Sequence, residues 1–212
     1  SMNDNIEHLI RQKTMFFETV THDIISPLNT LVGFTELLEK TVQTPKQKSY
    51  IKNIKYSTNY IQNLASDLVD FSKLEYNKII IKTDLFNFKE LIESIFEPLK
   101  ETAKQKNIDL KYQVEPVLND TFASDSYRIK QILTNIATNA IKFTKEGSVT
   151  IHAGQEKENI KITIKDTGIG IDKKYHDDIF KEFRQAHGDI EKIYGGTGLG
   201  LNITKRLVEL LD

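Results

Sequence analysis

The fold of the second part of the chain is decided by residues 160–170, Ile160-Lys161-Ile162-Thr163-Ile164-Lys165-Asp166-Thr167-Gly168-Ile169-Gly170. The first six residues alternate strictly between isoleucine and a polar side chain, which is the pattern of a half-buried β-strand. An acidic residue, a threonine and two glycines follow the strand directly. Because glycine has no Cβ, the backbone can approach a ligand closely there. The stretch therefore predicts a strand that ends either in a plain turn or in part of a binding site.

A second glycine cluster lies at residues 195–200, Gly195-Gly196-Thr197-Gly198-Leu199-Gly200, and six of the ten glycines fall in the two clusters. The cluster leads into a periodic apolar segment, Leu199–Leu211, which predicts a helix. A glycine-rich turn at a helix start presents free N–H groups and the positive end of the helix dipole, which suits phosphate. It lacks the Lys-Ser/Thr pair of a P-loop. The polar residues 171–194, with Phe180 and Phe183 among them, indicate either a lid or a surface loop.

The predicted helix that ends at Phe143 carries two asparagines on one face. Asn135 and Asn139 are four residues apart, and Lys142 continues the same face. Asparagine is unfavourable inside a helix, so two of them on one face need an explanation. Amide oxygens can bind Mg²⁺ whose charge is balanced by phosphates, and a lysine can neutralise phosphate. The alternative is a solvated polar face.

Residues 79–212 mix the two periodicities and predict an α+β domain, an α/β sandwich with helices on one face of a mixed sheet. The predicted strands are Ile79–Ile81, Ile108–Val114, Val149–Ala153 and Ile160–Lys165. The predicted helices are Phe88–Gln105, Asp125–Phe143 and Leu199–Leu211. Asn87 is the expected N-cap of the first of these helices, with Glu90 three residues later.

Residues 1–78 contain one glycine and no strand-like alternation. Pro45 separates two segments with apolar residues at three- and four-residue spacing, which predicts two helices joined by a turn near Val42–Lys46. Two such helices cannot cover their own apolar faces. The sequence therefore favours a four-helix bundle formed by two copies of the chain. The alternative is a monomeric hairpin packed on the second domain.

One histidine of this hairpin stands out. His22 lies roughly opposite Val20, Ile24 and Leu31 on a helical wheel and so is expected to face solvent. Asp23 is adjacent, and Pro27 is expected to kink the helix and free a carbonyl group. An exposed histidine beside a carboxylate can act as a nucleophile held in one tautomer. The remaining histidines are interpreted as surface residues without a chemical role, namely His8, His152, His176 and His187.

The composition excludes several classes of protein. The chain has 212 residues, 39 % hydrophobic and 28 % charged, as in ordinary globular domains. With 29 basic and 30 acidic residues it lacks the basic excess of a nucleic-acid binder. There is no cysteine, so cysteine nucleophiles and thiolate metal sites are excluded. No apolar run approaches the roughly 18 residues of a membrane span. No secretory signal is visible, which favours the cytoplasm for this segment.

Taken together, five segments resemble the sequence boxes of sensor histidine kinases from two-component signalling, in the family's order and over nearly the whole chain. They are the phosphoacceptor box His22-Asp23-Ile24-Ile25-Ser26-Pro27-Leu28, the N box Asn135–Phe143, the first glycine box Asp166–Gly170, the F box Ile179–Phe183 and the second glycine box Gly195–Leu201. The resemblance implies a dimerisation and phosphoacceptor hairpin, 1–78, and an ATP-binding domain of the Bergerat (GHKL) type, 79–212.

The resemblance also implies a role for each matching residue. Asn139 would bind Mg²⁺, Asn135 would lie beside the ion and the phosphates, and Lys142 would contact phosphate. Asp166 would accept a hydrogen bond from the amino group of adenine.

The glycine boxes and the F box complete the implied site. Gly168 and Gly170 would shape the adenine pocket and hinge the lid, and Arg184 would reach the γ-phosphate. The residues implied to wrap the phosphates are Gly196, Thr197, Gly198, Leu199 and Gly200.

The implied chemistry is ATP-dependent phosphorylation of His22, followed by transfer to an aspartate of a response-regulator receiver domain. Asp23 would accept the Nδ1 proton of His22 and orient its ring. The family's box commonly has Glu, Arg and Thr or Asn where this chain has Asp23, Ile25 and Ser26. Because Ser26 replaces the residue that serves the reverse reaction, we expect weak phosphatase activity. The family's closing strands would follow the last helix, so we interpret the chain as part of a longer sensor, whose remainder can include an inner-membrane span.

Three other functions fit parts of the sequence. Another GHKL-type ATPase would share the asparagine and glycine boxes, but it would not need an exposed histidine beside an acid. A protein serine kinase with the same ATP-binding fold would form an acid-stable phosphate ester. A non-catalytic dimerising scaffold would have no need for the complete nucleotide-binding set.

Overall fold

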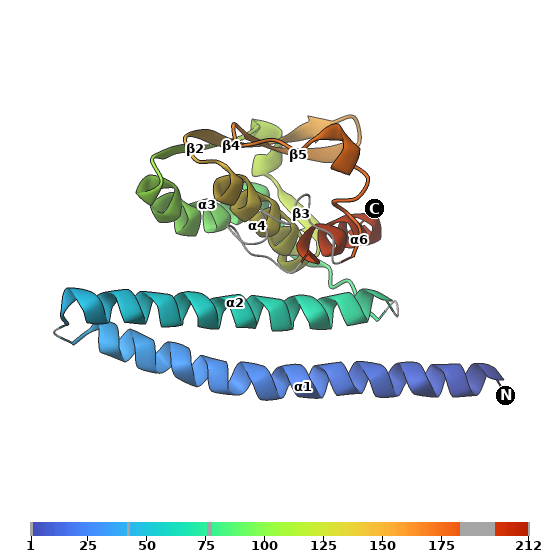
Figure 1. The fold of residues 1–212 in the computed structure, drawn as a ribbon. Coiled ribbons are helices and arrows are strands. Elements are labelled where there is room, and N and C mark those ends of the chain that lie inside the picture. The colour runs from blue at the N-terminus through green and yellow to red at the C-terminus, as the bar shows by residue number, and fades with distance from the viewer. Residues whose placement is uncertain (1, 42, 76–77, 183–197, 212) are drawn as a thin grey trace. The chain divides into compact units, whose positions relative to one another are not determined.

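A computed structural model of the chain describes residues 2–41, 43–75, 78–182 and 198–211 (Figure 1). The chain divides into two compact units, Ser1–Ile79 and Ile80–Asp212. Within the described ranges, no helix combines the length and the apolar character needed to cross a membrane.

The first unit is a hairpin of two long helices, α1 (Met2–Glu39) and α2 (Pro45–Glu75). Pro45 is the first residue of α2, a position where its missing N–H costs no helical hydrogen bond. Thr44 and Gln47 form a reciprocal cap: the Gln47 N–H donates to Thr44 Oγ1 at 3.3 Å, and the Thr44 N–H donates to Gln47 Oε1 at 2.8 Å. The predicted helical hairpin and its turn near Pro45 are confirmed.

The two helices pack along one seam with seven-residue spacing. Its buried members are Thr21, Leu28 and Thr35 on α1 and Ile51, Thr58 and Ala65 on α2. Two polar contacts set the register of the hairpin. Gln62 Nε2 donates to Asn29 Oδ1 at 2.7 Å, and Lys55 Nζ donates to Glu39 Oε2 at 2.7 Å.

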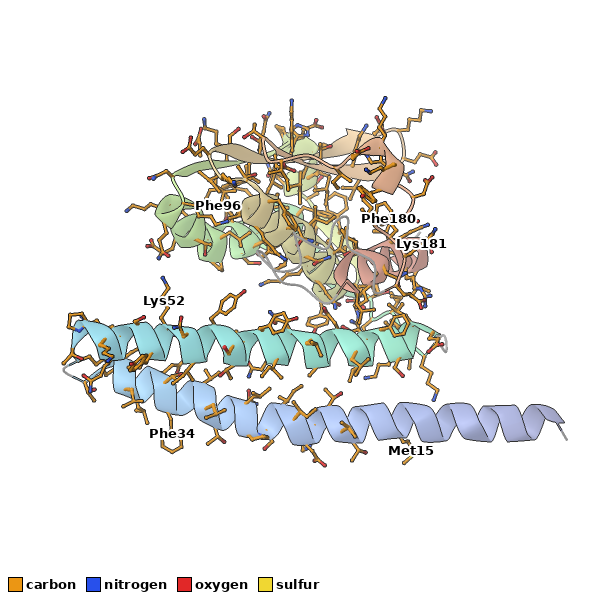
Figure 2. The ribbon with its side chains drawn as sticks, viewed as in Figure 1. Met15, Phe34, Lys52, Phe96, Phe180 and Lys181 are labelled. Carbon is orange, nitrogen blue, oxygen red and sulfur yellow. The ribbon has the colours of Figure 1, made fainter. Side chains whose placement is uncertain are left out.

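A second apolar seam, which we call the outer seam, stays uncovered within the chain. Its members are exposed, and they are Ile24, Leu31, Phe34, Leu38, Ile54, Ile61 and Leu64. In Figure 2, Phe34 points away from α2. Ile24 and Leu31, expected on the bundle-core side of α1, are therefore not buried by their own hairpin, and Leu31 keeps 48 % of its surface exposed.

In its described residues, the second unit combines strands with helices that pack beside a sheet (Figure 1). Its elements in order are β1 (Asp84–Asn87), α3 (Phe88–Gln105), β2 (Ile108–Val114), η1 (Pro116–Asn119), β3 (Thr121–Ser124), α4 (Ser126–Phe143), β4 (Gly147–Glu156), β5 (Asn159–Asp166), η2 (Lys173–Tyr175) and α6 (Gly200–Leu211). The helix α3 begins at its predicted cap, Asn87, and the cap of α4 is Asp125, the residue at which that helix was predicted to begin. Asn87 Oδ1 accepts from the Glu90 N–H, and Asp125 Oδ1 accepts from the Arg128 N–H.

The main sheet has the strand order β2-β4-β5, in which β2 runs parallel to β4 and β5 runs antiparallel to it. The predicted mixed sheet is thus confirmed. Its inner face carries Val149, Ile151 and Ala153 of β4, all almost fully buried against the core that α3 and α4 complete. The helices lie on one face of this sheet, as expected (Figure 1).

The strand expected at Ile79–Ile81 is wrong. Residues 78–83 have no regular structure, and Ile80 is 79 % exposed. The strand lies further on, at β1, and pairs antiparallel with β3, a short strand that the sequence analysis did not predict. An apolar run becomes a strand only where a neighbouring strand can accept its backbone hydrogen bonds. The isoleucine run instead connects the two units.

Candidate functional site

The asparagine face of α4 meets the start of α6. Asn135 Nδ2 donates to Thr204 Oγ1 at 2.8 Å, and Asn135, Asn139 and Lys142 are all half-buried. A Cβ at Gly200 would lie 2.7 Å from Asn135 Oδ1. Packing therefore explains why residue 200 is a glycine: the absence of a side chain leaves room for the Asn135 amide at the N-terminus of α6.

The described part of the second glycine box supports the start of α6. Gly198 has φ +70°, a left-handed conformation that glycine adopts without strain. Leu199 is 2 % exposed, and its carbonyl oxygen accepts from the Ile203 N–H, the first hydrogen bond of the helix. Three predicted site residues lie outside the described residues, namely Arg184, Gly196 and Thr197.

The loop after β5 is held by its threonine. The Thr167 N–H donates to the Ser148 carbonyl at 3.1 Å, and Thr167 Oγ1 accepts from the Ser148 N–H at 3.0 Å. A Cβ at Gly147 would lie 2.1 Å from that hydroxyl oxygen, so Gly147 makes room for it. Asp166 is exposed, and its Oδ1 accepts from the Gly168 N–H at 2.8 Å, which orients the carboxylate. Thr167 was not among the predicted site residues.

The same loop docks on the C-terminal end of α4. The Ile169 N–H donates to the Phe143 carbonyl at 3.3 Å. A Cβ at Gly168 would lie 2.6 Å from that carbonyl oxygen, so only glycine permits the approach. Gly170 has φ +67° and allows the chain to turn away. The loop and the asparagine helix, predicted separately to serve one site, are in direct contact.

Lys142 lies in the last turn of α4, in surroundings that disfavour its positive charge. Its Nζ is 5.0 Å from the centroid of the Phe143 ring. Burial and the nearby positive charge of Lys106 lower the pKa of Lys142 below its ordinary value. A bound anion would offset both effects.

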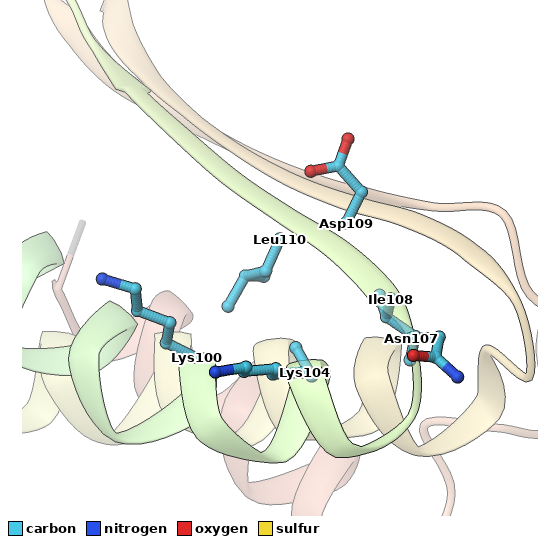
Figure 3. Close-up of a pocket in the computed structure, with 7 residues that line it drawn as sticks. Lys100, Lys104, Asn107, Ile108, Asp109 and Leu110 are labelled. Atoms are coloured by element: carbon cyan, nitrogen blue, oxygen red, sulfur yellow. The ribbon is translucent and has the colours of Figure 1, made fainter.

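A cavity of about 350 Å³ lies beside the docked loop and is lined by Lys145, Glu146, Thr167, Gly168 and Ile169. A larger one of about 490 Å³ lies between the end of α3 and the start of β2 (Figure 3). None of the predicted site residues lines the larger cavity, so it plays no part in the candidate site.

α6 also holds the described part of the F box. Asn202 Nδ2 donates to the Phe180 carbonyl at 2.8 Å, and Arg206 donates to Glu182 Oε1 at 2.7 Å. Lys205 Nζ lies 5.9 Å from the centroid of the Phe180 ring. The sequence analysis missed Asn202 and Arg206, because their partners lie about twenty residues away and no local pattern signals such contacts.

The phosphoacceptor candidate stands on the surface of α1. The His22 side chain is 83 % exposed, and its Nδ1 lies 3.5 Å from Asp23 Oδ1. Pro27 lies inside α1 and has no N–H, so the carbonyl of Asp23 loses its helical donor. Ser26 is exposed next to it. Two histidines that were interpreted as having no chemical role have polar neighbours. His152 Nε2 lies 3.6 Å from Glu115 Oε1, and His176 Nε2 lies 3.0 Å from the Ile171 carbonyl oxygen.

Within the described part of the chain, no group of three His, Cys, Asp or Glu side chains could hold a metal ion. A Mg²⁺ ion would therefore depend on an amide oxygen and on ligands that a bound molecule brings. Asn139 offers such an amide on the face of α4 that also carries Lys142. The donor set fits a cation that arrives with phosphates.

Each of two family matches lies within one of the two units. Residues 12–77 match the His Kinase A (phospho-acceptor) domain. Residues 124–212 match the Histidine kinase-, DNA gyrase B-, and HSP90-like ATPase family.

Curated relatives and solved structures agree with these matches. The sensor histidine kinase GacS of Pseudomonas protegens is 38 % identical over 94 % of this chain and 22 % of its own length. The signal transduction histidine-protein kinase BarA of Escherichia coli is 36 % identical over 93 % of this chain and 22 % of its own length. The chain thus spans about a fifth of these relatives.

Full-length ShkA in complex with AMPPNP is 30 % identical, with a TM-score of 0.72 over 92 % of this chain and 40 % of ShkA. The catalytic domain of the histidine kinase ThkA is 27 % identical, with a TM-score of 0.54 over 61 % of this chain and 82 % of that domain. The fold, both family matches and the named relatives agree that the chain belongs to the sensor histidine kinases of two-component systems.

Proposed function

We propose that the chain binds ATP in its second unit, phosphorylates His22 and passes the phosphoryl group to an aspartate of a response-regulator receiver domain. The observation that carries this proposal is the meeting of three segments far apart in sequence. The Asn135–Thr204 bond joins α4 to α6, and the Ile169–Phe143 bond joins the Asp166 loop to α4. The three segments therefore offer a nucleotide one continuous set of partners.

The adenine end of the nucleotide is assigned to the Asp166 loop. Because Gly168 N–H holds Asp166 Oδ1, the carboxylate is oriented and its Oδ2 can accept from the adenine amino group. Gly168 keeps this loop against α4, and Gly170 provides its turn. The carboxylate would select a base with an exocyclic amino group at this position.

The phosphate end is assigned to Lys142 and the start of α6. Backbone N–H groups from Gly198 to Gly200 and the positive end of the α6 dipole favour phosphate. Asn139 would hold Mg²⁺ together with phosphate oxygens, and Asn135 would lie beside them. The resemblance assigns further phosphate contacts to Gly196, Thr197, Leu199 and Arg184.

In the phosphoryl transfer, Nε2 of His22 forms a bond to the γ-phosphorus. The bond from that phosphorus to the bridging oxygen breaks, and ADP leaves with the electron pair. Asp23 accepts the Nδ1 proton in a hydrogen bond and stabilises the positive charge that develops on the ring. Bound Mg²⁺ would neutralise charge on the phosphates. The product is a phosphoramidate on His22. A receiver aspartate can accept its phosphoryl group through a carboxylate oxygen as the Nε2–phosphorus bond breaks. Ser26 takes the position of the residue that serves the reverse reaction, so we expect weak phosphatase activity.

The outer seam of the hairpin is assigned to a second copy of this chain. Its exposed side chains recur at three-, four- and seven-residue spacing along the two helices, which is the pattern of a helical bundle core. The solved complex of ThkA with the response regulator TrrA concerns a kinase of the same fold, 24 % identical to this chain. For this chain, we propose a receiver domain as partner and a cytoplasmic location.

Incubation with γ-labelled ATP and Mg²⁺ tests the proposal. We expect the wild-type chain to gain a label that acid removes and base does not, and we expect the His22→Gln variant to gain none. A His22→Gln chain labelled like the wild type would overturn the assignment of His22. An acid-stable label would indicate a serine kinase instead. ADP binding by an unlabelled wild-type chain would favour a non-catalytic scaffold.

A further inference from the structure

The C-terminal end of α4 is closed by donors from three separate parts of the second unit. A helix leaves its last four carbonyl groups without helical partners. The carbonyl of Ala140 accepts from Thr144, whose N–H lies at 3.1 Å and whose Oγ1 lies at 2.7 Å. The carbonyl of Phe143 accepts from the Ile169 N–H of the Asp166 loop.

The two carbonyls between them are held by one side chain from outside the sequence boxes. Lys106 Nζ donates to the Ile141 carbonyl at 2.9 Å and to the Lys142 carbonyl at 3.1 Å. A charged donor at a helix C-terminus is also favoured by the helix dipole. All four terminal carbonyls of α4 thus have a donor.

Local sequence explains why Lys106 reaches this position. Asn107 has φ +55°, a left-handed conformation that asparagine tolerates better than most residues. It follows the cap of α3, where the Lys106 N–H donates to the Ala103 carbonyl and the Asn107 N–H to the Lys104 carbonyl. The chain therefore turns sharply between α3 and β2, and the Lys106 side chain is carried to the end of α4.

We infer that Lys106 is a positioning residue for the nucleotide site, an inference that rests on the proposed function. It fixes the last turn of α4, which carries Lys142, the proposed phosphate contact, and onto which the Asp166 loop docks through Phe143. Lys106 thereby holds the phosphate end and the adenine end of the site in one arrangement.

The test compares ADP binding, in the presence of Mg²⁺, by the full chain and by Lys106→Met, which keeps the length of the side chain but loses its donors. We expect the dissociation constant to rise about tenfold, because two carbonyls beside Lys142 lose a charged partner. Lys106→Arg retains charge and donors and should stay within about threefold of the wild type. Lys104→Met is the matched control. This exposed lysine in the last turn of α3 contacts none of the α4 carbonyls among the described residues, and its removal should change nothing.

Hydrogen exchange without nucleotide separates this inference from the proposed function. In Lys106→Met the Ile169 amide should exchange faster, because its acceptor turn is loosened, while the Ile151 amide in the sheet keeps its protection. Unchanged ADP affinity in a folded Lys106→Met chain would overturn the inference. If the wild-type chain bound no ADP, the proposed function would fail, and unchanged Ile169 exchange in Lys106→Met would then overturn the inference on its own.

Discussion

The hairpin and the second unit hold their functional residues in different ways. His22 stands on the surface of α1, and its Nδ1 lies 3.5 Å from Oδ1 of the next residue in the chain, Asp23. Asn135 and Gly168 of the second unit are instead fixed by contacts with elements far away in sequence. In the hairpin, the residue proposed to react therefore makes no contact among the described residues that holds the fold together. In the second unit, residues proposed to serve the nucleotide site also make contacts that stabilise the fold. Substitutions should reveal this difference.

The largest effect is expected at the outer seam, which we propose is covered by a second copy of the chain. In Leu31→Asp each copy should lose about 1.5–3 kcal/mol of apolar burial, and twofold symmetry doubles the loss. The dissociation constant of the dimer should rise at least about 100-fold, as measured by sedimentation. Asn63→Asp adds the same charge at an exposed polar position of α2 and should leave the dimer intact. A Leu31→Asp chain that remains dimeric at the same concentration would refute the assignment of the seam.

The second unit should respond most strongly at Gly168. An alanine Cβ would stand 2.6 Å from the Phe143 carbonyl oxygen, so the Asp166 loop must leave α4. ADP affinity, measured by calorimetry, should fall about 100-fold, or about 2.7 kcal/mol.

The control for this substitution lies in the hairpin. A Cβ at Gly33 in α1 meets no atom within 4 Å, and Gly33→Ala should stabilise the protein by about 0.5–1 kcal/mol. Equal effects of the two glycine substitutions on ADP binding would contradict the contrast between the units.

Removal of the Thr44 cap of α2 should destabilise the hairpin without a separate effect on the phosphorylation of His22. Thr44→Ala deletes the hydroxyl that accepts from the Gln47 N–H and should lower the free energy of unfolding by about 1 kcal/mol. Urea denaturation measures this change, with Ser49→Ala on the exposed surface of α2 as the control. A loss of label on His22 larger than the loss of folded protein would show that capping and chemistry are coupled.

The smallest effect on stability is expected at Lys142. Its sign is informative, because we expect the substitution to stabilise the fold while it weakens ADP binding. Because burial and the Lys106 charge lower the pKa of Lys142, the folded chain binds fewer protons than the unfolded chain between the lowered value and 10.5. The charged lysine therefore opposes folding below its lowered pKa, and this penalty fades as pH rises through it. Lys142→Met should raise the free energy of unfolding near neutral pH by less than about 1 kcal/mol, while it weakens ADP binding. A loss of stability at neutral pH would mean that the packing of the lysine stem outweighs its charge.

Sequence patterns predict those parts of the molecule whose signals are local. Asn87 and Glu90 predicted the start of α3, and the alternating isoleucines predicted β5, because caps and periodicity act within a few residues. The strand prediction at 79–81 was wrong because a strand needs a neighbouring strand to pair with. In this unit β1, and not the isoleucine run, pairs with β3. The short strand β3 offers too few residues to show a period.

The candidate site divides in the same way. The side chains expected to touch the nucleotide, such as Asp166 and Asn139, belong to boxes that can be read from the sequence. The residues that hold these side chains in place cannot be predicted from the sequence, because their partners lie far away along the chain. Thr167 pairs with Ser148, Lys106 with the end of α4, and Asn202 with Phe180.

We propose that a nucleotide held in the second unit phosphorylates His22 in the hairpin. Mass spectrometry at alkaline pH, where a phosphoramidate survives, tests this claim directly on the chain after incubation with ATP and Mg²⁺. We expect phosphate on His22 in the wild type and in the surface control Asp109→Asn, and none in Asp166→Asn. Phosphate on His22 in Asp166→Asn at the wild-type level, or phosphate on another residue in the wild type, would contradict the account.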